Sequence, residues 1–478
     1  MLCSHSSFTL HQLVLKLLIS FLLYYYSSSP ILVFGSTIPT MHPLEQETLF
    51  KIMETLSSDQ DWRSSYPNPC RPGASSWPGI VCKFTANDTR YSHVTRLDFG
   101  TPPNPSCKNS ATFPPEIFEL PHLESIFIFQ CFTRTPTRIT FPPPNRALPT
   151  PSPLQQLSLR SNSALIGAIP PRLISTLTSL HILTLSQNRL SGRIPTATFP
   201  AGSSLVHLDL SYNMLTGPIP SEIGSFQKLV GLDLSYNRLT GEIPSSIGEL
   251  AVLQKLDLSS NSLGGTIPQS VFNSLESLVF LALSNNRLNI HGAGFGGKKK
   301  IGLRNLQYFL MDGNPMFAPL PVEFGQLKKL QELRLSNSGY WGKIPPEYSQ
   351  LVNLSSLSLQ NNRLSGEIPA GFAGLSRIYH MNLSRNLLDG VVPFNSSFLR
   401  RLGRNLDLSG NAGLCLTPSA AAAAAEDDGG GGGVGVGVCG KTKRGSPLKI
   451  SEAPLLGWCC NYNNLVFTLL LMLFWLLF

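Results

Sequence analysis

Hydrophobic and polar positions alternate in the same way three times between Leu205 and Pro268. Each copy begins with Leu-x-x-Leu-x-Leu, continues to an asparagine and ends with Gly-x-Ile-Pro, and the copies follow one another every 24 residues. Successive side chains of a strand point to opposite faces, so Leu208 and Leu210 are predicted to point inward and Asp209 outward. The pattern therefore predicts one short strand in every copy.

Self-similarity at this period, with a Leu-x-x-Leu-x-Leu-x-x-Asn core, is typical of a leucine-rich-repeat solenoid. We expect an α/β solenoid, that is, a right-handed leucine-rich-repeat superhelix with a parallel concave sheet and disulfide-stapled N- and C-terminal caps. Asn213, Asn237 and Asn261 are expected to form a ladder that satisfies buried backbone groups where each coil leaves its strand. One coil cannot bury its leucines alone, so the array is the folding unit.

The same pattern, counted along the chain, predicts an array of about 13 repeats over residues 94–411. It is interrupted after Asn286, where the next ladder position, Asn314, falls 28 residues later. A glycine-rich segment and three lysines over residues 290–300 replace the usual Gly-x-Ile-Pro. We expect the strand of the second sheet to be lost at this point.

Both ends of the chain differ from the array. The apolar stretch from Leu13 to Phe34 predicts a secretory signal peptide over residues 1–35, with a signal anchor as the alternative. Residues 36–93 are expected to form an N-terminal cap with an amphipathic helix and a Trp-Pro-Gly-Ile-Val-Cys run at Trp77 to Cys82. Residues 412–440 are expected to form a C-terminal cap with a low-complexity loop. The predicted helix has apolar residues at helical spacing, namely Leu44, Leu49, Ile52, Met53 and Leu56.

The cysteines lie near the ends of the array, with none between Cys131 and Cys415. This placement favours disulfide-closed caps and an oxidising, extracellular compartment. Proximity along the chain suggests three pairs, which are Cys70 with Cys82, Cys107 with Cys131, and Cys415 with Cys439.

The last 14 residues, 465–478, are uncharged and apolar apart from Thr468, whereas a spanning helix needs about 20 apolar residues. Together with a stem over residues 441–464, they suggest a lipid-anchor signal with attachment at Ser451. The alternative is a minimal transmembrane anchor that also recruits Leu455 and Leu456. In either case we expect the repeats on the extracellular face of the cell membrane.

Composition excludes several classes of function. The net charge of +9 is moderate and scattered, and no nucleic-acid module is visible, so we expect no nucleic-acid partner. No catalytic triad, metal-ligand spacing, phosphate loop or kinase signature stands out, so we expect neither an enzyme nor a cofactor. Asp209, Asp233 and Asp257 should stack on adjacent strands about 5 Å apart, and we interpret them as a solvated ladder rather than as a catalytic acid pair.

Binding is the remaining function, and the concave face is its default site in a solenoid. Most repeats offer small polar residues there, but the repeats near the interruption offer aromatic and charged ones. Such a cluster has the composition of an interface hot spot. The alternative is that segment 292–300 folds back over it. The candidate ligand-binding residues are Phe280, Tyr308, Leu310, Glu332, Arg334, Tyr340 and Trp341.

Four Asn-x-Ser/Thr sequons, at Asn87, Asn353, Asn382 and Asn395, predict N-glycosylation in a secreted protein. Asn382 falls on an outward strand position. A glycan there would occupy the C-terminal part of the concave face and would leave earlier repeats for a ligand.

The cap and the array together resemble the extracellular region of plant leucine-rich-repeat receptors. Residues 41–440 are similar to the receptor-like proteins that lack a kinase, in particular to the subgroup that includes Too Many Mouths. The similar stretches are Leu157 to Asn162, Leu183 to Leu190, Ser397 to Gly403 and Asn405 to Asn411. The resemblance implies recognition of a secreted peptide or protein ligand in concert with a leucine-rich-repeat receptor kinase. The rival hypothesis is a wall-associated recognition or inhibitor protein that binds polysaccharide or a wall-degrading enzyme.

Overall fold

The computed structural model describes residues 40–57, 61–71, 77–85, 88–100, 102–143, 148–149, 152–195, 203–289, 301–425 and 434–440. The predicted signal peptide, residues 441–478, Asn87 and Ser451 lie outside them. The chain divides after Val438 into two compact units. The repeat unit, which ends at Val438, is described by itself.

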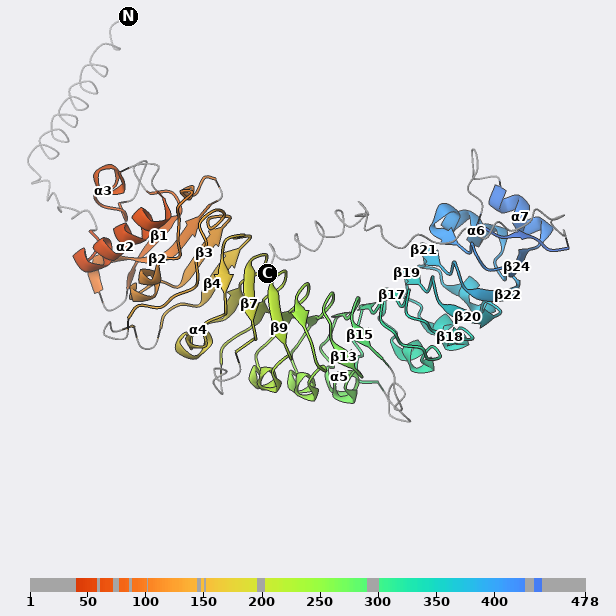
Figure 1. Ribbon diagram of the computed structural model, residues 1–478. Coiled ribbons are helices and arrows are strands. Elements are labelled where there is room, and N and C mark those ends of the chain that lie inside the picture. The colour runs from red at the N-terminus through yellow and green to blue at the C-terminus, as the bar shows by residue number, and fades with distance from the viewer. Residues whose placement is uncertain are drawn as a thin grey trace, which may run out of the picture. The chain divides into compact units, whose positions relative to one another are not determined.

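The N-terminal cap is built on helix α2 (Pro43–Leu56), which covers the first coils (Figure 1). Leu49, Ile52, Met53 and Leu56 are fully buried, as their spacing predicts, whereas Leu44 in the first turn is 75% exposed and does not belong to the buried face. Helix α3 (Trp62–Ser65) is capped at its N-terminus by Asp61, whose side chain accepts a hydrogen bond from the Ser64 N–H. Trp62 stacks on Trp77 with ring centroids 4.9 Å apart.

Two disulfides close the N-terminal end of the repeat unit, one within the cap and one within the first coils, and they are the pairs expected from the sequence. Cys70 is bonded to Cys82, and Cys107 to Cys131. Cys131 is buried, because it stands where later coils place the ladder asparagine. Cys415 and Cys439 are also disulfide-bonded, and their pairing with each other stays a prediction.

In the described residues a 14-stranded sheet runs through the whole repeat unit. Strand β1 (Ile80–Thr85) pairs with β2 (Asp88–Phe99) in antiparallel fashion, and the thirteen strands from β2 onward are parallel, one for each expected repeat. The strands after β2 are β3 (Ser125–Phe129), β4 (Gln156–Arg160), β6 (Ile182–Thr184), β8 (His207–Asp209), β10 (Gly231–Asp233), β12 (Lys255–Asp257), β14 (Phe280–Ala282), β16 (Tyr308–Leu310), β17 (Glu332–Arg334), β19 (Ser356–Ser358), β21 (His380–Asn382) and β23 (Leu406–Asp407).

Shorter strands after the ladder asparagines form a second, interrupted sheet layer. The described parts are β5 (Ile166–Gly167), β7 (Arg189–Gly192), β9 (Met214–Gly217) and β11 (Arg238–Leu239), then β13 (Gly264–Gly265) and β15 (Arg287–Leu288), then β18 (Trp341–Gly342), β20 (Arg363–Gly366), β22 (Leu387–Val391), β24 (Gly413–Leu416) and β25 (Gly437–Val438).

The interruption of the second sheet falls one coil later than predicted. Strand β15 forms directly after Asn286, so this coil keeps its strand. The following coil, which contains Asn314, has none, and its only bridge within the described residues joins Pro319 to Trp341. Proline lacks the N–H that a strand ladder needs, and this coil carries Pro315 and Pro319.

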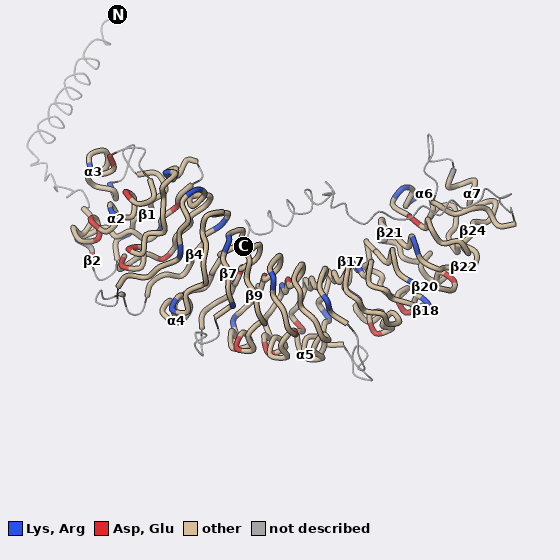
Figure 2. The backbone as a smooth tube through the Cα atoms, viewed as in Figure 1, with Lys and Arg blue, Asp and Glu red and all other residues tan. Residues whose placement is uncertain are grey.

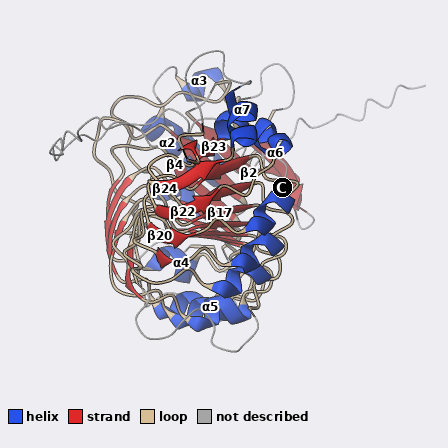
Figure 3. Ribbon diagram, turned by 90° about the vertical axis from the view of Figure 1, so that its right-hand side faces the viewer, coloured by secondary structure: helices blue, strands red, loops and turns tan. Residues whose placement is uncertain are grey.

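Short helices close the coils, and those along the outer edge of the curve in Figure 1 lie on the side away from the 14-stranded sheet. Figure 3 shows α5 at the lower end of the coils. Many of these helices begin just after a proline, whose fixed φ suits a helix start. They are η1 (Pro115–Glu119), α4 (Arg172–Thr176), η2 (Ser221–Ser225), η3 (Ser245–Glu249), α5 (Gln269–Ser274), η4 (Val322–Gln326), η5 (Pro346–Gln350), η6 (Ala370–Gly374), α6 (Ser396–Leu402), η7 (Gly403–Asn405) and α7 (Pro418–Ala425).

The asparagine ladder connects neighbouring coils through hydrogen bonds to the backbone. Oδ1 of Asn261 accepts from Leu239 N of the preceding coil at 3.0 Å. Its Nδ2 donates to Leu234 O of that coil at 3.0 Å and to Leu258 O of its own coil at 3.2 Å. The leucines of neighbouring coils are buried beside this ladder. Lys and Arg are interspersed with Asp and Glu along the chain in Figure 2.

The ladder generates a prediction about stability. Asn286→Ala removes the acceptor of Leu263 N and the donor to Leu258 O and Leu283 O, all of which lie in the core. Leaving buried backbone groups unpaired should lower the free energy of unfolding by about 2 to 4 kcal/mol. Urea denaturation of the secreted protein measures this loss. The neighbouring exposed Arg287→Ala is the control, and an equal loss in both variants would contradict a structural role for the amide.

Candidate ligand-binding site

Three neighbouring strands of the large sheet bring the predicted cluster together. Phe280 on β14, Tyr308 on β16 and Glu332 on β17 are register partners. The rings of Phe280 and Tyr308 are tilted against each other with centroids 6.1 Å apart. Two residues further along, Leu310 stands beside Arg334. All of these side chains except that of Arg334 are half-buried, and that of Arg334 is 44% exposed.

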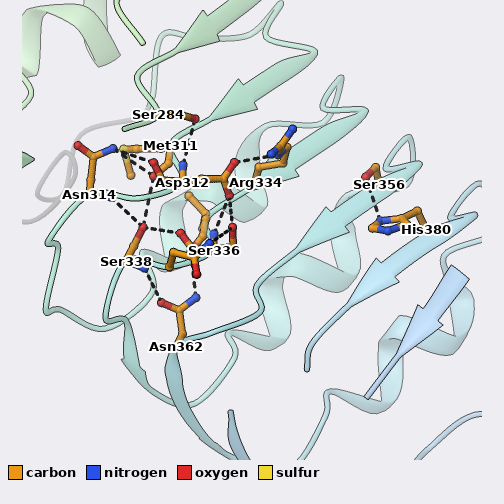
Figure 4. A network of polar contacts seen from close by, with 12 residues as sticks. Ser284, Met311, Asp312, Asn314, Arg334, Ser336, Ser338, Ser356, Asn362 and His380 are labelled. Carbon is orange, nitrogen blue, oxygen red and sulfur yellow. Dashed lines mark hydrogen bonds and ion pairs between the residues drawn. The ribbon is translucent and has the colours of Figure 1, made fainter. Parts of the chain in front are cut away.

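Arg334 is held in place by a buried carboxylate. Its Nε lies 2.8 Å from Oδ2 of Asp312, which is only 6% exposed. Oδ1 of Asp312 accepts hydrogen bonds from Ser336 N at 2.8 Å and from Ser336 Oγ at 2.5 Å. Figure 4 shows Asp312 between Arg334, Ser336 and Ser284, whose Oγ accepts from Asp312 N. The guanidinium is therefore oriented by its own protein before any ligand binds.

This network differs from a hydrogen-bond motif that other coils form within a single coil. In those coils an aspartate binds the serine two residues later, as Asp233 accepts from Ser235 N and Oγ and Asp257 accepts from Ser259. At β17 the aspartate position is taken by Arg334, so Ser336 has no such partner on its own strand. Asp312 supplies the carboxylate from the preceding coil instead.

Burial changes the protonation of groups around the cluster. It raises the pKa of Glu332, an effect that the Arg334 cation opposes and the Asp312 carboxylate reinforces. It also raises the pKa of Tyr308, whose hydroxyl donates to Oε1 of Gln331 at 3.3 Å. Burial and then Arg334 lower the pKa of His380, which lies 3.4 Å from Oγ of Ser356. The site thus presents Arg334 as its fixed cation among groups that are harder to ionise.

The aspartate ladder borders the cluster and is less solvated than expected. Nζ of Lys255 lies 2.8 Å from Oδ2 of Asp233 and 5.8 Å from the centre of the Phe280 ring. Burial and then the neighbouring Asp233 carboxylate raise the pKa of Asp257 to about 6, and the pKa of Asp209 is raised for the same reasons. The interpretation as a solvated ladder is therefore corrected, because burial raises the pKa of two of its carboxyls. The carboxylates are partly buried and share one lysine.

Two of the predicted site residues do not belong to the concave face. Tyr340 is fully buried, because it stands two residues after the ladder position, where Leu364 and Leu388 of later coils also point into the core. Trp341 is 51% exposed, but it begins β18 of the second sheet and not a strand of the large sheet. The concave cluster therefore reduces to Phe280, Tyr308, Leu310, Glu332 and Arg334.

Three of the sequons lie within the described residues. Nδ2 of Asn353 donates to Lys328 O at 2.7 Å. Asn382 is half-buried on β21, and its Oδ1 accepts from Ser384. Asn395 is exposed and caps α6 through its Oδ1, which accepts from Phe398 N. Glycosylation at each of them stays a prediction.

The sequence did not point to three exposed aromatic side chains. Tyr212 and Tyr236 stack with centroids 4.1 Å apart and are each 46% exposed. Phe317 is 63% exposed on the second sheet side. The signal for Phe317 is its place three residues after Asn314, where other coils have small or polar residues such as Thr216 and Thr240.

The part of the chain that the structure describes has no cluster of three or more His, Cys, Asp and Glu side chains placed to hold a metal ion. The helices found in those ranges are all too short or too polar to cross a membrane.

Comparisons with known proteins agree with this architecture. The family model "Leucine rich repeat" matches residues 227–288, and a second model of the same description matches residues 204–226 and 353–375. Receptor like protein 29 of Arabidopsis thaliana is 65% identical over 150 residues, which are 31% of this chain and 31% of that protein. Protein TOO MANY MOUTHS of Arabidopsis thaliana is 37% identical over 145 residues, which are 29% of this chain and 27% of that protein.

Among solved structures, the crystal structure of PEPR1-AtPEP1 superposes with a TM-score of 0.58 and 29% identity, over 78% of this chain and 49% of that one. The matches to the curated relatives span about a third of their length. Fold and sequence together define a leucine-rich-repeat protein. Over these segments the chain is similar to plant leucine-rich-repeat receptor-like proteins.

The aspartate ladder generates a prediction about pH. The folded-state pKa of Asp257, about 6, lies above its ordinary value of 3.8, so the folded state holds the proton more tightly than the unfolded state. This stabilisation is present at low pH and is lost as the pH rises through about 6. Asp257→Asn should therefore raise the free energy of unfolding at pH 7.5 by roughly 1 kcal/mol, and the gain should shrink to nothing by about pH 4.

Denaturation at several pH values measures this difference. Asp407→Asn is the matched control, because the register partner of Asp407 on β21 is Asn382 and not a second carboxylate. A pH-independent effect of Asp257→Asn would contradict the prediction.

Proposed function

We propose that this chain is a cell-surface receptor-like protein without a kinase domain that recognises a secreted peptide or protein ligand. It reaches the extracellular face of the membrane by the secretory pathway, is held there by a C-terminal lipid anchor, and acts with a leucine-rich-repeat receptor kinase. The observation that carries the proposal is the row of aromatic, apolar and cationic side chains on β14, β16 and β17, in register on the open face of the large sheet.

The geometry of this row suits a peptide or protein. Strands of one sheet lie about 4.8 Å apart, so three of them span roughly 10 Å, the length of a few extended residues. Phe280, Tyr308 and Leu310 supply apolar contact that is already partly desolvated. The Nη groups of Arg334 make no hydrogen bond to any described residue, so they remain available for a carboxylate or carbonyl oxygen of a ligand.

The comparisons support a receptor role for the repeat domain. One of its curated relatives is named Receptor like protein 29, and the extracellular setting agrees with the disulfides at the N-terminal end of the repeat unit. The ligand class, the partner kinase and the anchor go beyond these similarities and are part of the proposal.

The test of recognition is a double substitution within the row. Tyr308→Ala with Arg334→Lys removes the ring and the guanidinium fork but keeps a cation beside Asp312, so the fold should survive. Truncating hot-spot side chains typically costs about 2 kcal/mol or more. The double variant should therefore bind its ligand at least tenfold more weakly. The measurement is microscale thermophoresis of the purified repeat domain against a panel of secreted plant peptides.

Thr184→Ala is the control, because Thr184 occupies the same outward position as Leu310 and Arg334 on the remote strand β6. Gly231 is unsuitable as a control, since a Cβ there would come within 2.7 Å of His207 Nδ1. Unchanged peptide affinity in the double variant would refute recognition by this row. Binding of polygalacturonate alone would favour the wall-associated alternative.

A further inference from the structure

A second aromatic surface lies outside the candidate ligand-binding site, on the second sheet side of the same coils. Phe317 is 63% exposed and Trp341 is 51% exposed. Each stands three residues after a ladder position, which is Asn314 in one coil and Ser338 in the next. The equivalent residues of other coils are small or polar, namely Ser191, Thr216, Thr240, Gly264, Ser365 and Asp389.

The two aromatic side chains are fixed by the protein itself. The indole Nε1–H of Trp341 donates to Phe317 O at 3.1 Å, and Trp341 N donates to Ala318 O at the same distance. The ring of Phe317 lies over Gly339, where a Cβ would come within 2.6 Å of Cδ1. A glycine is thus needed beneath the ring. Exposed aromatic side chains that are already ordered lose little conformational entropy when a partner covers them.

Two basic side chains lie beside this pair, and the exposed carboxylates of Glu367 and Asp389 follow in the next two coils. Arg363 on β20 is the register partner of Trp341, and Lys343 lies two residues after it. Both side chains are exposed, and neither forms an ion pair with a described residue. Two coils further on, Leu387 and Val391 on β22 are 64% and 50% exposed. The surface therefore has an aromatic centre, two unpaired cations beside it and an apolar extension.

We propose that Phe317 and Trp341 form the centre of a docking surface for a second protein, which presents an apolar side chain flanked by carboxylates. Charge complementarity with Lys343 and Arg363 selects the acidic flank, and large exposed aromatic side chains are the usual anchors of protein interfaces. The inference rests on the proposed receptor function, because it assigns the partner kinase's extracellular domain a place on this chain.

The position of the docking surface connects ligand binding with docking of the second protein. The coil that carries Leu310 on the large sheet also carries Phe317, and the coil that carries Arg334 also carries Trp341. A protein docked on this pair therefore contacts the same two coils that carry Leu310 and Arg334.

The experiment uses an array of recombinant leucine-rich-repeat receptor-kinase ectodomains as probes and the secreted full repeat domain as analyte, measured by biolayer interferometry. At least one ectodomain should bind the wild type, and Phe317→Ser with Trp341→Ser should weaken that binding at least tenfold. Arg363→Glu should weaken it as well, because it repels the acidic flank. Tyr212→Ser with Tyr236→Ser removes another exposed aromatic pair and should leave the affinity unchanged.

Three results would overturn the docking surface. They are the absence of any binding ectodomain, equal affinity of the wild type and the Phe317/Trp341 variant, and self-association in sedimentation that only this variant loses. The last would show a surface between copies of this chain. The Tyr308/Arg334 variant separates the two proposals, since its loss of peptide affinity would keep the recognition function valid even if no ectodomain binds.

Discussion

The structure depends on the hydrogen bonds of the ladder asparagines. A ladder amide such as that of Asn261 accepts a backbone N–H from the preceding coil and donates to carbonyls of both coils, so it fixes where the chain turns out of its strand and how the next coil stacks. The buried leucines supply the hydrophobic stabilisation, but they are non-directional. Without the directional amide bonds, the strands of successive coils would not be held in the same register, and outward residues from distant parts of the sequence would not line up.

The ladder is altered where the candidate site lies. Ser338 takes the place of an asparagine, and its Oγ accepts from Asn314 N and donates to Ser336 O. Oδ1 of Asn362 accepts from both Ser338 N and Tyr340 N, so the backbone of this coil stays satisfied. The coil keeps its stacking while its outward residues depart from the repeat. Functional residues can therefore change without loss of the array.

The carboxylate contacts also differ between the regular coils and the candidate site. In the regular coils an aspartate binds the serine two residues later in its own coil. Around Arg334 the carboxylate comes from the neighbouring coil, so the cation, Asp312 and Ser336 form one connected unit across two strands. A network of this kind orients the guanidinium and ties its position to the stacking of the coils. The exposed pair Phe317 and Trp341 sits on the same two coils, on their other side.

The sequence by itself determined the repeat, the inward leucines, the ladder and the two disulfide pairs of the N-terminal cap, because these features repeat at a fixed spacing or lie close along the chain. It also located Phe280, Tyr308, Leu310 and Arg334 on one face, since strand alternation is a local rule. Only the tertiary structure decided that Tyr340 is buried and that Trp341 faces away from the large sheet. It likewise decided that Asp312 reaches Ser336 of the next coil and that Asp257 is partly desolvated. These properties depend on what neighbouring coils place around a side chain, which the period of a single coil does not contain.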